Sequence, residues 1–554
     1  MFHNRYMSNK NIFFAIIIIA FLIRIWGLGS QELLGDEGVY AFRSVGYLDY
    51  IGTSFQTQPI DWYKGMALPA WTKLSFHDHP PLSFLINNLF FTLLGDSVFV
   101  ARLASALFGI GSIILFYFIV KELSLSLVGD EAEKFSLLSS FIFSLNSGAI
   151  LISRVVLIES ILLFFIIFNI YLFLKLLKDI KYWWLFGISL GLVALTKYIG
   201  VFLIPLYFIY LFILKRNLLK RKELYYSLFL ALLVFSPVII YNYYLYQFTG
   251  HFDLQIAYLL SQDTPEWTGL LGKAQSPFSQ IIPNLISLYS LFILSTALAG
   301  LFIISYKINK QLKENKEYGG YLFIYLYIIC LTLLLVKIGS ANRFIALYSP
   351  AISILIAIII GYLWIVKNKL SLFSKFIVIA FVLWMGYFSI NKIVNQQINY
   401  GIIGLDNYLN EEFKDVESAV IPESDNNHLT DIIYKYSKKR TDNPRKFFMI
   451  VYNDNISLPI IDWVFYRRFF YHGIPTMYVE NFNSVIQSEG VDYFKGFNVY
   501  FIQSTENTLL NEFKKDKVAS LELENNLLNQ GLSPEKIIYG HNNLPMFKIY
   551  KFSF

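Results

Sequence analysis

Long apolar runs recur along most of the chain. Segments such as 12–29, 161–174 and 351–366 approach or reach the roughly 20 residues that cross a bilayer core as a helix. Hydrophobic residues make up 56% of the chain and charged residues only 15%, which lies far outside the range of water-soluble domains. The sequence therefore predicts a polytopic α-helical membrane protein.

The spacing of the apolar runs predicts about eleven membrane-spanning helices, separated by short charged loops. The expected ranges are 11–29, 97–120, 135–151, 158–174, 183–196, 199–214, 224–246, 285–305, 319–336, 344–366 and 372–390. A further apolar stretch, 81–94, is too short to span comfortably, so we expect a helix lying at the membrane surface there.

The distribution of Lys and Arg predicts the orientation of these helices. If the N-terminus is cytoplasmic, most of the basic residues fall in cytoplasmic loops, as the positive-inside rule requires. The opposite loops then hold only Arg43, Lys64, Lys73, Arg154, Lys197, Lys273, Lys337 and Arg343. We expect a multi-pass protein of the cell membrane with its C-terminus outside. The first apolar run is expected to be a retained helix, because no small-x-small cleavage site follows it.

The character of the sequence changes near residue 391. Charges and Asn become frequent, and short apolar strands at 447–451, 476–479 and 499–501 alternate with amphipathic helical stretches such as 429–438. This alternation predicts a small extracytoplasmic α/β domain. We therefore expect a transmembrane domain at 1–390, whose first outer loop spans 30–96, and a second domain at 391–554.

Composition excludes several classes of function. The net charge of +7 does not indicate nucleic-acid binding, because the lysines cluster in short loops between apolar segments. The single cysteine, Cys330, lies within an apolar run, so one chain offers no disulfide or Cys-based metal site. The absence of a Walker loop, a dinucleotide fingerprint and a Ser-hydrolase elbow argues against nucleotide-driven transport and those hydrolases.

Two adjacent acids follow the first expected helix. Asp36 and Glu37 lie in the segment Gly-Asp-Glu-Gly-Val-Tyr, which ends at Tyr40. Adjacent acids are common in solvated loops, but other expected outer segments also present ionisable groups near the membrane. These groups are Arg102, Arg154, Glu159, Lys197 and Arg343.

The cations in this set have two interpretations. Lys and Arg near helix ends often extend to the interface, and Arg102 can be such an anchor. The positive-inside rule, however, disfavours cations on the outer face. Short outer loops that contain Lys197 and Arg343 therefore also suggest a requirement for positive charge, for which a lipid-linked phosphate is the natural partner.

A second polar cluster lies at His77, Asp78 and His79. Alternating His and Asp can ligate a divalent metal, with His251 from a later outer loop as a further ligand. The alternative is a plain polar loop that ends at Pro80 and Pro81. The residues alone leave both interpretations open.

The order of several short motifs resembles a known family. Gly-Asp36-Glu37-x-x-Tyr40-Ala is followed by His79-Pro-Pro-Leu, Ala-Arg102-Leu, Ser-Arg154, Glu159-Ser, Ala-Leu-Thr-Lys197-Tyr198 and Asn-Arg343-Phe. This order resembles the protein O-mannosyltransferase and aminoarabinose-transferase group of the membrane glycosyltransferase C superfamily. The likeness covers about residues 10–365.

The resemblance implies an inverting sugar transfer from a polyprenyl-phosphate carrier to a protein, glycolipid or glycan on the outer face. It also implies a bundle of about 11 to 13 helices. Asp36 would be the base, beside Glu37; Lys197, Arg343 and Arg102 would bind the donor phosphate. The resemblance places Tyr40, His79, Glu159 and Tyr198 at the substrate, although relatives usually have Asp at the position of Glu159 and often Lys at that of His79.

The implied chemistry agrees with the residues. An attacking hydroxyl needs a carboxylate within ~3 Å as general base. Cations can stabilise the departing phosphate, so neither a second acid nor a cofactor is required, although a divalent metal stays possible. A transporter or flippase of lipid-linked saccharides is the alternative function. An oligosaccharyltransferase is less expected, because the C-terminal region has no Trp-Trp-Asp-type motif.

Overall fold

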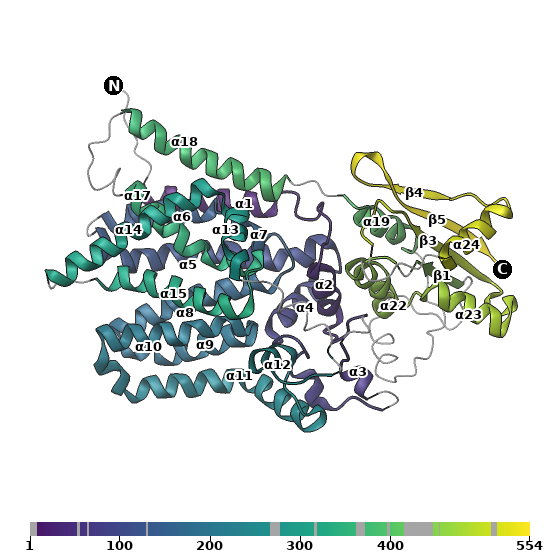
Figure 1. The fold of residues 1–554 in the computed structure, drawn as a ribbon, viewed down its shortest axis with the longest axis horizontal. Coiled ribbons are helices and arrows are strands. Elements are labelled where there is room, and N and C mark those ends of the chain that lie inside the picture. Colours follow the sequence, from purple (N-terminus) through teal and green to yellow (C-terminus); the bar gives the residue numbers. More distant parts are fainter. Residues whose placement is uncertain are drawn as a thin grey trace. The chain divides into compact units, whose positions relative to one another are not determined.

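The protein forms two compact units, each assembled from separate stretches of the chain (Figure 1). The computed structural model describes residues 8–52, 56–63, 66–128, 131–265, 267, 278–314, 318–361, 372–395, 399–414, 447–453, 455–510 and 518–554. The helical unit comprises Met1–Leu28, Lys73–Ser83 and Arg102–Gln396. The mixed unit comprises Gly29–Thr72, Phe84–Ala101 and Gln397–Phe554, and so combines most of the predicted first outer loop with the C-terminal region.

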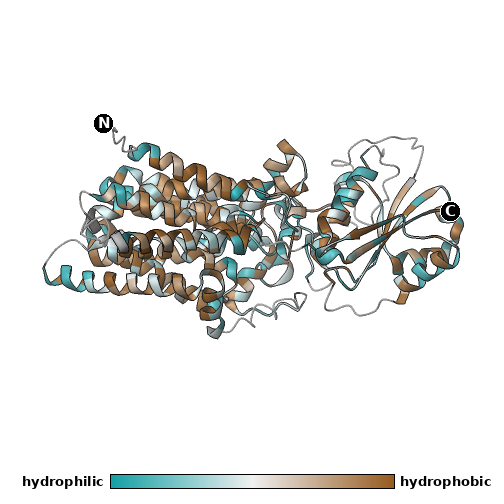
Figure 2. Ribbon diagram, turned by 90° about the horizontal axis from the view of Figure 1, so that it is seen from above, coloured by the Kyte–Doolittle hydropathy of each residue, from teal (hydrophilic) through white to brown (hydrophobic). Residues whose placement is uncertain are grey.

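The helical unit has the composition of a membrane bundle, and hydrophobic residues dominate its helices (Figure 2). Within the described residues, seven helical spans are long and apolar enough to cross a membrane. Five of them lie in α5 (Val98–Val128), α8 (Ile158–Lys178), α11 (Lys222–Thr249), α14 (Leu291–Lys313) and α15 (Gly319–Ile338). The other two are Asn342–Gly361, which ends with α17 (Ser349–Gly361), and Lys375–Val394, which begins within α18 (Leu372–Ser389). The predicted polytopic helical class is therefore confirmed, whereas the number of eleven spans stays a prediction.

The remaining bundle helices are shorter or broken: α1 (Asn9–Ile25), α6 (Ala132–Ser144), α7 (Ser147–Ser153), α9 (Trp183–Thr196), α10 (Leu203–Leu214) and α13 (Ile281–Tyr289). The predicted helix 135–151 is bent by 59° between α6 and α7. Asn146 begins α7 there, since its side chain accepts the Ala149 N–H at 3.2 Å. The predicted helix 285–305 breaks at Ser290, which has a φ of 68° and caps α14.

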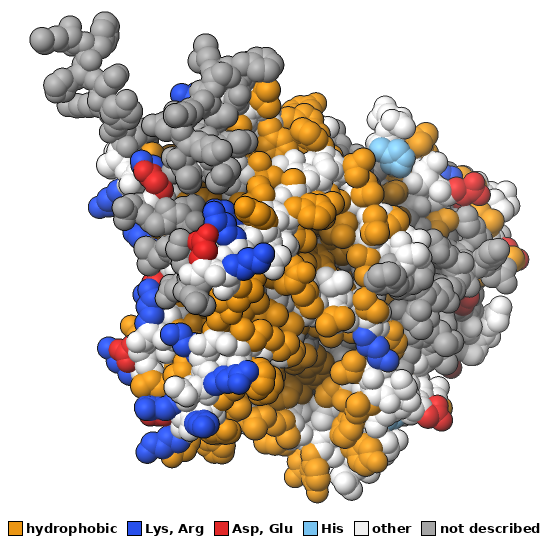
Figure 3. All heavy atoms as spheres, turned by 60° about the vertical axis from the view of Figure 1, so that its left-hand side comes forward, with side chains coloured by type: hydrophobic (Ala, Val, Ile, Leu, Met, Phe, Trp, Pro, Cys, Tyr) orange, Lys and Arg blue, Asp and Glu red, His pale blue; other side chains and the backbone are white. Residues whose placement is uncertain are grey.

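The surface of the helical unit separates apolar and basic side chains (Figure 3). Large hydrophobic side chains such as Phe208, Phe229 and Phe302 are exposed along its helices. Lys and Arg gather at one end, where α8, α10 and α14 finish and α9 and α11 begin. A broad apolar surface bounded by a basic end is the pattern expected of a bundle with that end in the cytoplasm.

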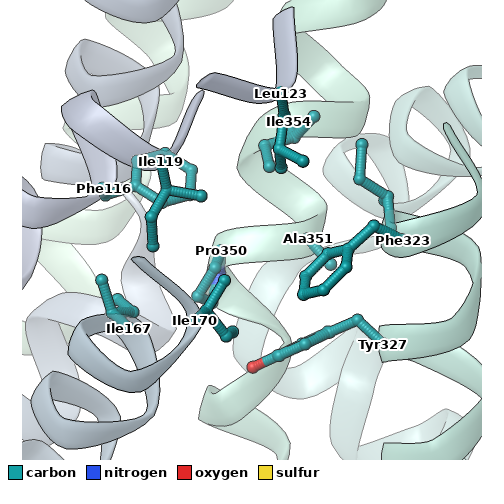
Figure 4. A pocket seen from close by; sticks show the side chains of 11 residues that line it. Phe116, Ile119, Leu123, Ile167, Ile170, Phe323, Tyr327, Pro350, Ala351 and Ile354 are labelled. Atoms are coloured by element: carbon teal, nitrogen blue, oxygen red, sulfur yellow. The ribbon is translucent and has the colours of Figure 1, made fainter. Parts of the chain in front are cut away.

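The bundle core is closely packed. Side chains of α5, α8, α15 and α17 surround a small core cavity of only about 30 Å³, which is room for little more than one water molecule (Figure 4). Tyr327 closes one side, and its hydroxyl donates a hydrogen bond to the Leu347 carbonyl at 2.8 Å. This cavity is part of the core and is too small for a substrate.

The C-terminal part of the mixed unit is built on a five-stranded sheet with the order β2-β1-β3-β5-β4. Its strands are β1 (Phe447–Tyr452), β2 (Thr476–Tyr478), β3 (Phe497–Ser504), β4 (Lys536–Tyr539) and β5 (Pro545–Ser553). β1 runs parallel to β2 and β3, while β5 runs antiparallel to β3 and β4. The three strands predicted from the sequence, and with them the small α/β fold, are confirmed; the expected helix at 429–438 lies outside the described residues.

Alternate side chains of this sheet form a core with α23 (Val479–Glu489) and α24 (Val518–Asn529). Val451 and Phe501 from the central strands pack with Phe482 of α23 and Leu527 of α24. Truncating a side chain such as Phe482 to Ala is expected to cost about 3–5 kcal/mol of folding free energy. The sheet therefore has a core of its own.

Helices from the first outer loop complete the mixed unit. They include α2 (Asp36–Gly46), α3 (Pro59–Trp62) and the larger part of α4 (Leu82–Leu94). α4 corresponds to the predicted surface helix at 81–94. Its exposed Leu85, Leu89 and Leu93 recur every fourth residue on one face, as a helix lying in a membrane surface requires.

Candidate functional site

Three ionisable side chains meet in the helical unit, and we call them the ion triad. Glu159 lies in the first turn of α8, Lys197 directly follows α9, and Arg343 belongs to the short helix α16 (Asn342–Ile345). Lys197 Nζ lies 2.7 Å from Glu159 Oε1, and Arg343 Nε lies 3.7 Å from the same oxygen. One carboxylate thus joins two cations from separate parts of the chain.

The local backbone explains how these side chains reach one another. Lys197 ends α9 because its backbone is extended, with a φ of −165° and a ψ of 138°. Glu159 occupies the positive end of the α8 dipole, which stabilises its negative charge. Phe344 lies beside both cations, with its ring centre 5.0 Å from Lys197 Nζ and 5.1 Å from the Arg343 guanidinium.

Burial differs within the ion triad. The Glu159 side chain is 0% exposed and that of Lys197 7%, whereas that of Arg343 is 24% exposed. A buried ion left without its partner destabilises a protein by several kcal/mol, so Glu159 needs a cation close by. The triad carries two positive charges and one negative charge. Among these three side chains, positive charges therefore exceed negative charges by one.

Lys197 and Arg343 line a cavity of about 470 Å³, which we call the polar cavity. The other polar side chains in its wall are His79, Tyr198, Gln255, Tyr258 and Ser340. Most of the remaining wall is apolar and includes Val201, Phe235, Leu259, Leu334 and Ile338. This combination of a few polar groups with an apolar wall is typical of ligand sites.

A second cavity of about 340 Å³ adjoins the first and is lined by α9, α10 and α11; we call it the apolar cavity. Both cavities share Tyr198, Val201 and Phe235 as wall residues. Apart from Tyr198, its wall consists of aliphatic residues, glycines and Phe235. An amphipathic ligand can therefore place a charged group in one cavity and a hydrocarbon chain in the other.

A buried carboxylate holds one wall of the polar cavity. Asp253 begins α12 (Leu254–Leu260) and accepts the backbone N–H groups of Gln255 and Ile256 at 3.1 and 3.0 Å. Its Oδ2 accepts the Tyr198 hydroxyl at 2.5 Å and the Asn242 amide at 2.8 Å. Burial raises the pKa of Asp253 above its ordinary value, against these hydrogen bonds, which lower it. The network joins α12, the turn at Tyr198 and α11.

The predicted acid pair begins helix α2 in the mixed unit. Asp36 is the first helical residue and is partly exposed, while Glu37 is buried. The preceding Gly35 has a φ of 54°, a conformation that side-chain-bearing residues rarely adopt. Glu37 Oε2 accepts the Leu34 N–H at 3.3 Å and so fixes the turn that presents Asp36. Tyr40, one turn later, packs edge-on against Phe84 with ring centres 5.7 Å apart.

Arg102 lies in α5 and is almost fully buried. Its Nη1 donates to the Leu28 carbonyl at 3.0 Å, which anchors the chain just after α1. Arg154 acts on the same region, since its Nη1 donates to the Ile23 carbonyl at 2.7 Å. These contacts lie within the protein, and the interpretation of Arg102 as an interface anchor stays a prediction. The phosphate-binding role stays a prediction.

The predicted metal ligands have protein partners within the helical unit. Asp78 Oδ2 lies 2.9 Å from His79 Nδ1. His251 Nδ1 lies 2.8 Å from the Phe252 carbonyl. The rings of His251 and His77 lie 4.4 and 5.8 Å from the Trp267 ring. The His77–His79 segment and the His251 loop therefore meet around Trp267, as the metal hypothesis requires, and metal binding stays a prediction.

The structure therefore brings His79, Lys197, Tyr198 and Arg343 to one cavity. Glu159 forms an ion pair with Lys197 and lies close to Arg343. Asp36, Glu37 and Tyr40 belong to the other unit. Sequence reasoning missed Asp253 and Asn242, and it included Phe344 only as part of the Asn-Arg343-Phe motif. An Asp directly before the apolar stretch Leu254–Leu260 is a helix N-cap signal that identifies the position of Asp253 but not its partners.

Part of the chain matches a known protein family. Residues 78–241, which include His79, Arg102, Glu159 and Lys197, match the family described as dolichyl-phosphate-mannose-protein mannosyltransferase. No curated protein matches the chain in sequence. The resemblance inferred from the order of motifs is confirmed.

Solved structures share the fold. ArnT from Cupriavidus metallidurans in the apo state has a TM-score of 0.53 and 13% identity, covering 98% of both chains. The same protein bound to undecaprenyl phosphate has a TM-score of 0.52 and 12% identity, again covering 98% of both. An apo oligosaccharyltransferase from Archaeoglobus fulgidus has a TM-score of 0.53 and 12% identity, covering 90% of this chain and 70% of that one. Identities this low show the fold alone.

Proposed function

We propose that this chain, which has the fold of the glycosyltransferase C superfamily, moves a sugar from a polyprenyl-phosphate carrier to a hydroxyl acceptor. The transfer takes place at the extracytoplasmic face and inverts the anomeric carbon. The observation that carries the proposal is the ion triad beside the polar cavity, where Lys197 and Arg343 face a largely apolar wall.

The charge of the triad matches the donor. A sugar linked to a lipid through one phosphate is a phosphodiester and carries one negative charge, whereas a diphosphate linkage carries two. The triad has two cations and one carboxylate, so its net charge of one positive unit balances a monophosphate carrier. Cations placed at the leaving phosphate stabilise the charge that develops as the sugar departs.

The adjoining apolar cavity supports a lipid carrier. The two cavities share wall residues, so a phosphate beside Lys197 and Arg343 can continue into a prenyl chain between α9, α10 and α11. The similar ArnT was solved with undecaprenyl phosphate, a lipid of this kind. Tyr198, which lines both cavities, would then contact the junction between phosphate and chain.

Asp36 is the proposed general base. It would take the proton from the acceptor hydroxyl as the oxygen attacks the anomeric carbon, while the carbon–oxygen bond to phosphate breaks and phosphate leaves with the electron pair. One direct displacement inverts the configuration and needs one base. Glu37 would orient Asp36 through its bond to the Leu34 N–H, and Tyr40 and His79 would contact the sugar or the acceptor.

The direction of the helices supports an outer-face site. Basic residues such as Lys175, Lys178 and Lys181 lie at the end of α8 and the beginning of α9. The triad residues Glu159 and Lys197 lie at the opposite ends of the same two helices. If the basic end is cytoplasmic, the triad is extracytoplasmic.

A metal is not needed for this chemistry, because the triad cations face the leaving phosphate. The His77–His79 segment and His251 are the groups that would hold a divalent cation. Chelation followed by readdition of divalent metal tests this directly: we expect transfer to continue after chelation. Loss of transfer that metal restores would assign a metal to these residues.

The deciding experiment uses purified protein and a panel of radiolabelled polyprenyl-phosphate sugars with protein, glycolipid and glycan acceptors. We expect label to reach an acceptor with wild-type protein and not with Asp36→Asn. Donor that crosses liposomes without cleavage, at the same rate in wild type and Asp36→Asn, would identify a flippase instead. The productive donor and acceptor would name the sugar and the acceptor class.

A further inference from the structure

We propose that residues 458–472 of the C-terminal region position the helix that carries Asp36, so that this region is a working part of the transferase. The inference rests on the proposed function of Asp36. The 458–472 segment comprises α21 (Leu458–Ile460), a π-helical turn at Ile461–Tyr466 and α22 (Arg467–His472), and it belongs to the mixed unit together with α2.

The first observation is that the backbone of α2, and of the loop after it, lies in direct contact with this segment. A Cβ added to Gly38 would lie 2.4 Å from the Pro459 carbonyl oxygen, and one added to Gly46 would lie 2.3 Å from the Tyr471 ring. A Cβ on Gly52 would likewise lie 2.3 Å from the Tyr466 ring. Contacts below 3.0 Å essentially never occur at real Cβ atoms, so both ends of α2 require glycine.

The second observation is a specific hydrogen bond within an aromatic cluster. The Tyr471 hydroxyl donates to the Phe42 carbonyl in α2 at 3.1 Å. The Phe42 ring is fully buried, with ring centres 5.4 and 5.8 Å from Tyr471 and Phe470. Tyr50 adds another ring to the cluster, with its centre 5.0 Å from that of Phe470. These contacts fix the rotation of α2 about its own axis and its position along the 458–472 segment.

The third observation is a buried ionisable side chain on each side of the contact. Arg43 of α2 is fully buried and its Nη2 lies 2.5 Å from Asp49 Oδ1. Asp462 of the 458–472 segment is also fully buried. Burial raises the pKa of Asp462 well above its ordinary value, and the positive charge of Arg43 acts in the opposite direction. Arg43 and Asp462 therefore interact across the contact, which couples α2 to the segment.

The segment is itself held in place, as a positioning element must be. Arg467 Nη2 and Arg468 Nη1 lie 2.5 and 2.8 Å from Asp406 Oδ1 of α19 (Ile402–Glu412). The Trp463 indole donates to the other Asp406 oxygen at 3.3 Å. Catalytic geometry depends on such support, because a displacement of about 1 Å can reduce a rate about a hundredfold.

Two variants test the inference without touching Asp36. Gly46→Ala inserts a methyl group against the Tyr471 ring, and Tyr471→Phe removes only the hydroxyl that bonds to Phe42. The matched control is Tyr550→Phe, which removes a hydroxyl bonded to Glu524 at 2.6 Å in the same sheet domain, away from α2. The measurements are the kcat and donor KM of the full-length protein, together with donor binding and Tm.

We expect kcat to fall at least tenfold in Gly46→Ala and about threefold in Tyr471→Phe, with donor KM and donor binding unchanged. Tyr550→Phe should keep the kcat of wild type even where its Tm falls equally. If Gly46→Ala does not fold, Tyr471→Phe decides. The inference is overturned if folded Tyr471→Phe has the kcat of wild type, or if Tyr550→Phe loses as much. Failure of wild type itself to transfer sugar would instead refute the proposed function.

Discussion

Different interactions hold the ion triad and helix α2, which carries the acid pair. Glu159, Lys197 and Arg343 hold one another through charge, inside a mostly apolar wall. Asp36 is instead presented by a helix whose glycines and aromatic ring lie against residues 458–472. Charge therefore organises the proposed donor site, and close packing organises the proposed base.

This difference predicts different consequences of mutation. Substitution of a charged group that both supports the fold and binds the ligand should lower protein stability and ligand affinity together. Substitution of a base on the partly exposed first turn of a well-packed helix should lower kcat alone. The predictions below test this separation, beginning with the largest effect.

The largest effect is expected at Asp36. Asp36→Asn should lower kcat by about 10²- to 10⁴-fold, the range typical of acid–base catalysts, because the amide cannot accept the acceptor proton. Donor affinity and Tm should stay near wild type, since Asp36 is partly exposed. Asp263→Asn is the control, because Asp263 is an exposed acid on another loop that is predicted to lie outside. Wild-type turnover in Asp36→Asn would refute its role as base.

The next effect is expected at Lys197. Among the described residues, Lys197→Met leaves the fully buried Glu159 with Arg343, 3.7 Å away, as its remaining cation, and should cost about 3–5 kcal/mol of stability along with donor affinity. The double variant Lys197→Met/Glu159→Gln should recover most of the stability and none of the affinity. The measurements are Tm and donor binding. Full recovery of affinity in the double variant would show that Lys197 serves only to neutralise Glu159.

The cations of the ion triad could be singled out from the sequence because charge is unusual where they occur. Lys197 and Arg343 stand in short loops that are predicted to lie outside, a position that the positive-inside rule disfavours. Their pairing with Glu159 was not predicted, because the sequence does not show which side chains of separate helices meet. The geometry of Asp253 was not predictable, since its partner Tyr198 is 55 residues away in sequence.

The breaks in the bundle escaped prediction for a related reason. Asn146 and Ser290 lie within long apolar runs, and hydropathy over a window of about 20 residues outweighs one capping side chain. The partners of α2 were hidden by distance, because Tyr471 and Phe42 are 429 residues apart. Sequence periodicity describes each element, whereas such contacts depend on the whole fold.

A smaller effect is expected at Arg343, whose side chain is 24% exposed. Arg343→Gln should weaken donor binding by about tenfold, roughly 1.4 kcal/mol, while Tm changes little because Lys197 still neutralises Glu159. Binding of an uncharged polyprenol should be unaffected in the same variant. If Arg343→Gln instead lowers Tm as much as Lys197→Met, charge pairing within the triad does not differ between its two cations.

The smallest effect concerns the support of the 458–472 segment and is a dependence on pH. Burial alone raises the pKa of Asp406, but Arg467 and Arg468 more than offset it and hold that pKa below its ordinary value. The carboxylate therefore stabilises the fold fully above the ordinary Asp pKa of about 3.9, and this stability is lost as pH falls through the lower folded-state value.

Wild-type Tm should accordingly fall between pH 6 and about pH 3, by a few degrees for each ~1 kcal/mol lost. Asp406→Asn should have a lower Tm at pH 6 and a smaller fall on acidification, because its side chain no longer titrates. The difference between the two proteins isolates Asp406 from the other carboxylates. An equal fall in both would mean that the ion pairs of Arg467 and Arg468 contribute nothing to holding the segment, and that packing alone positions α2.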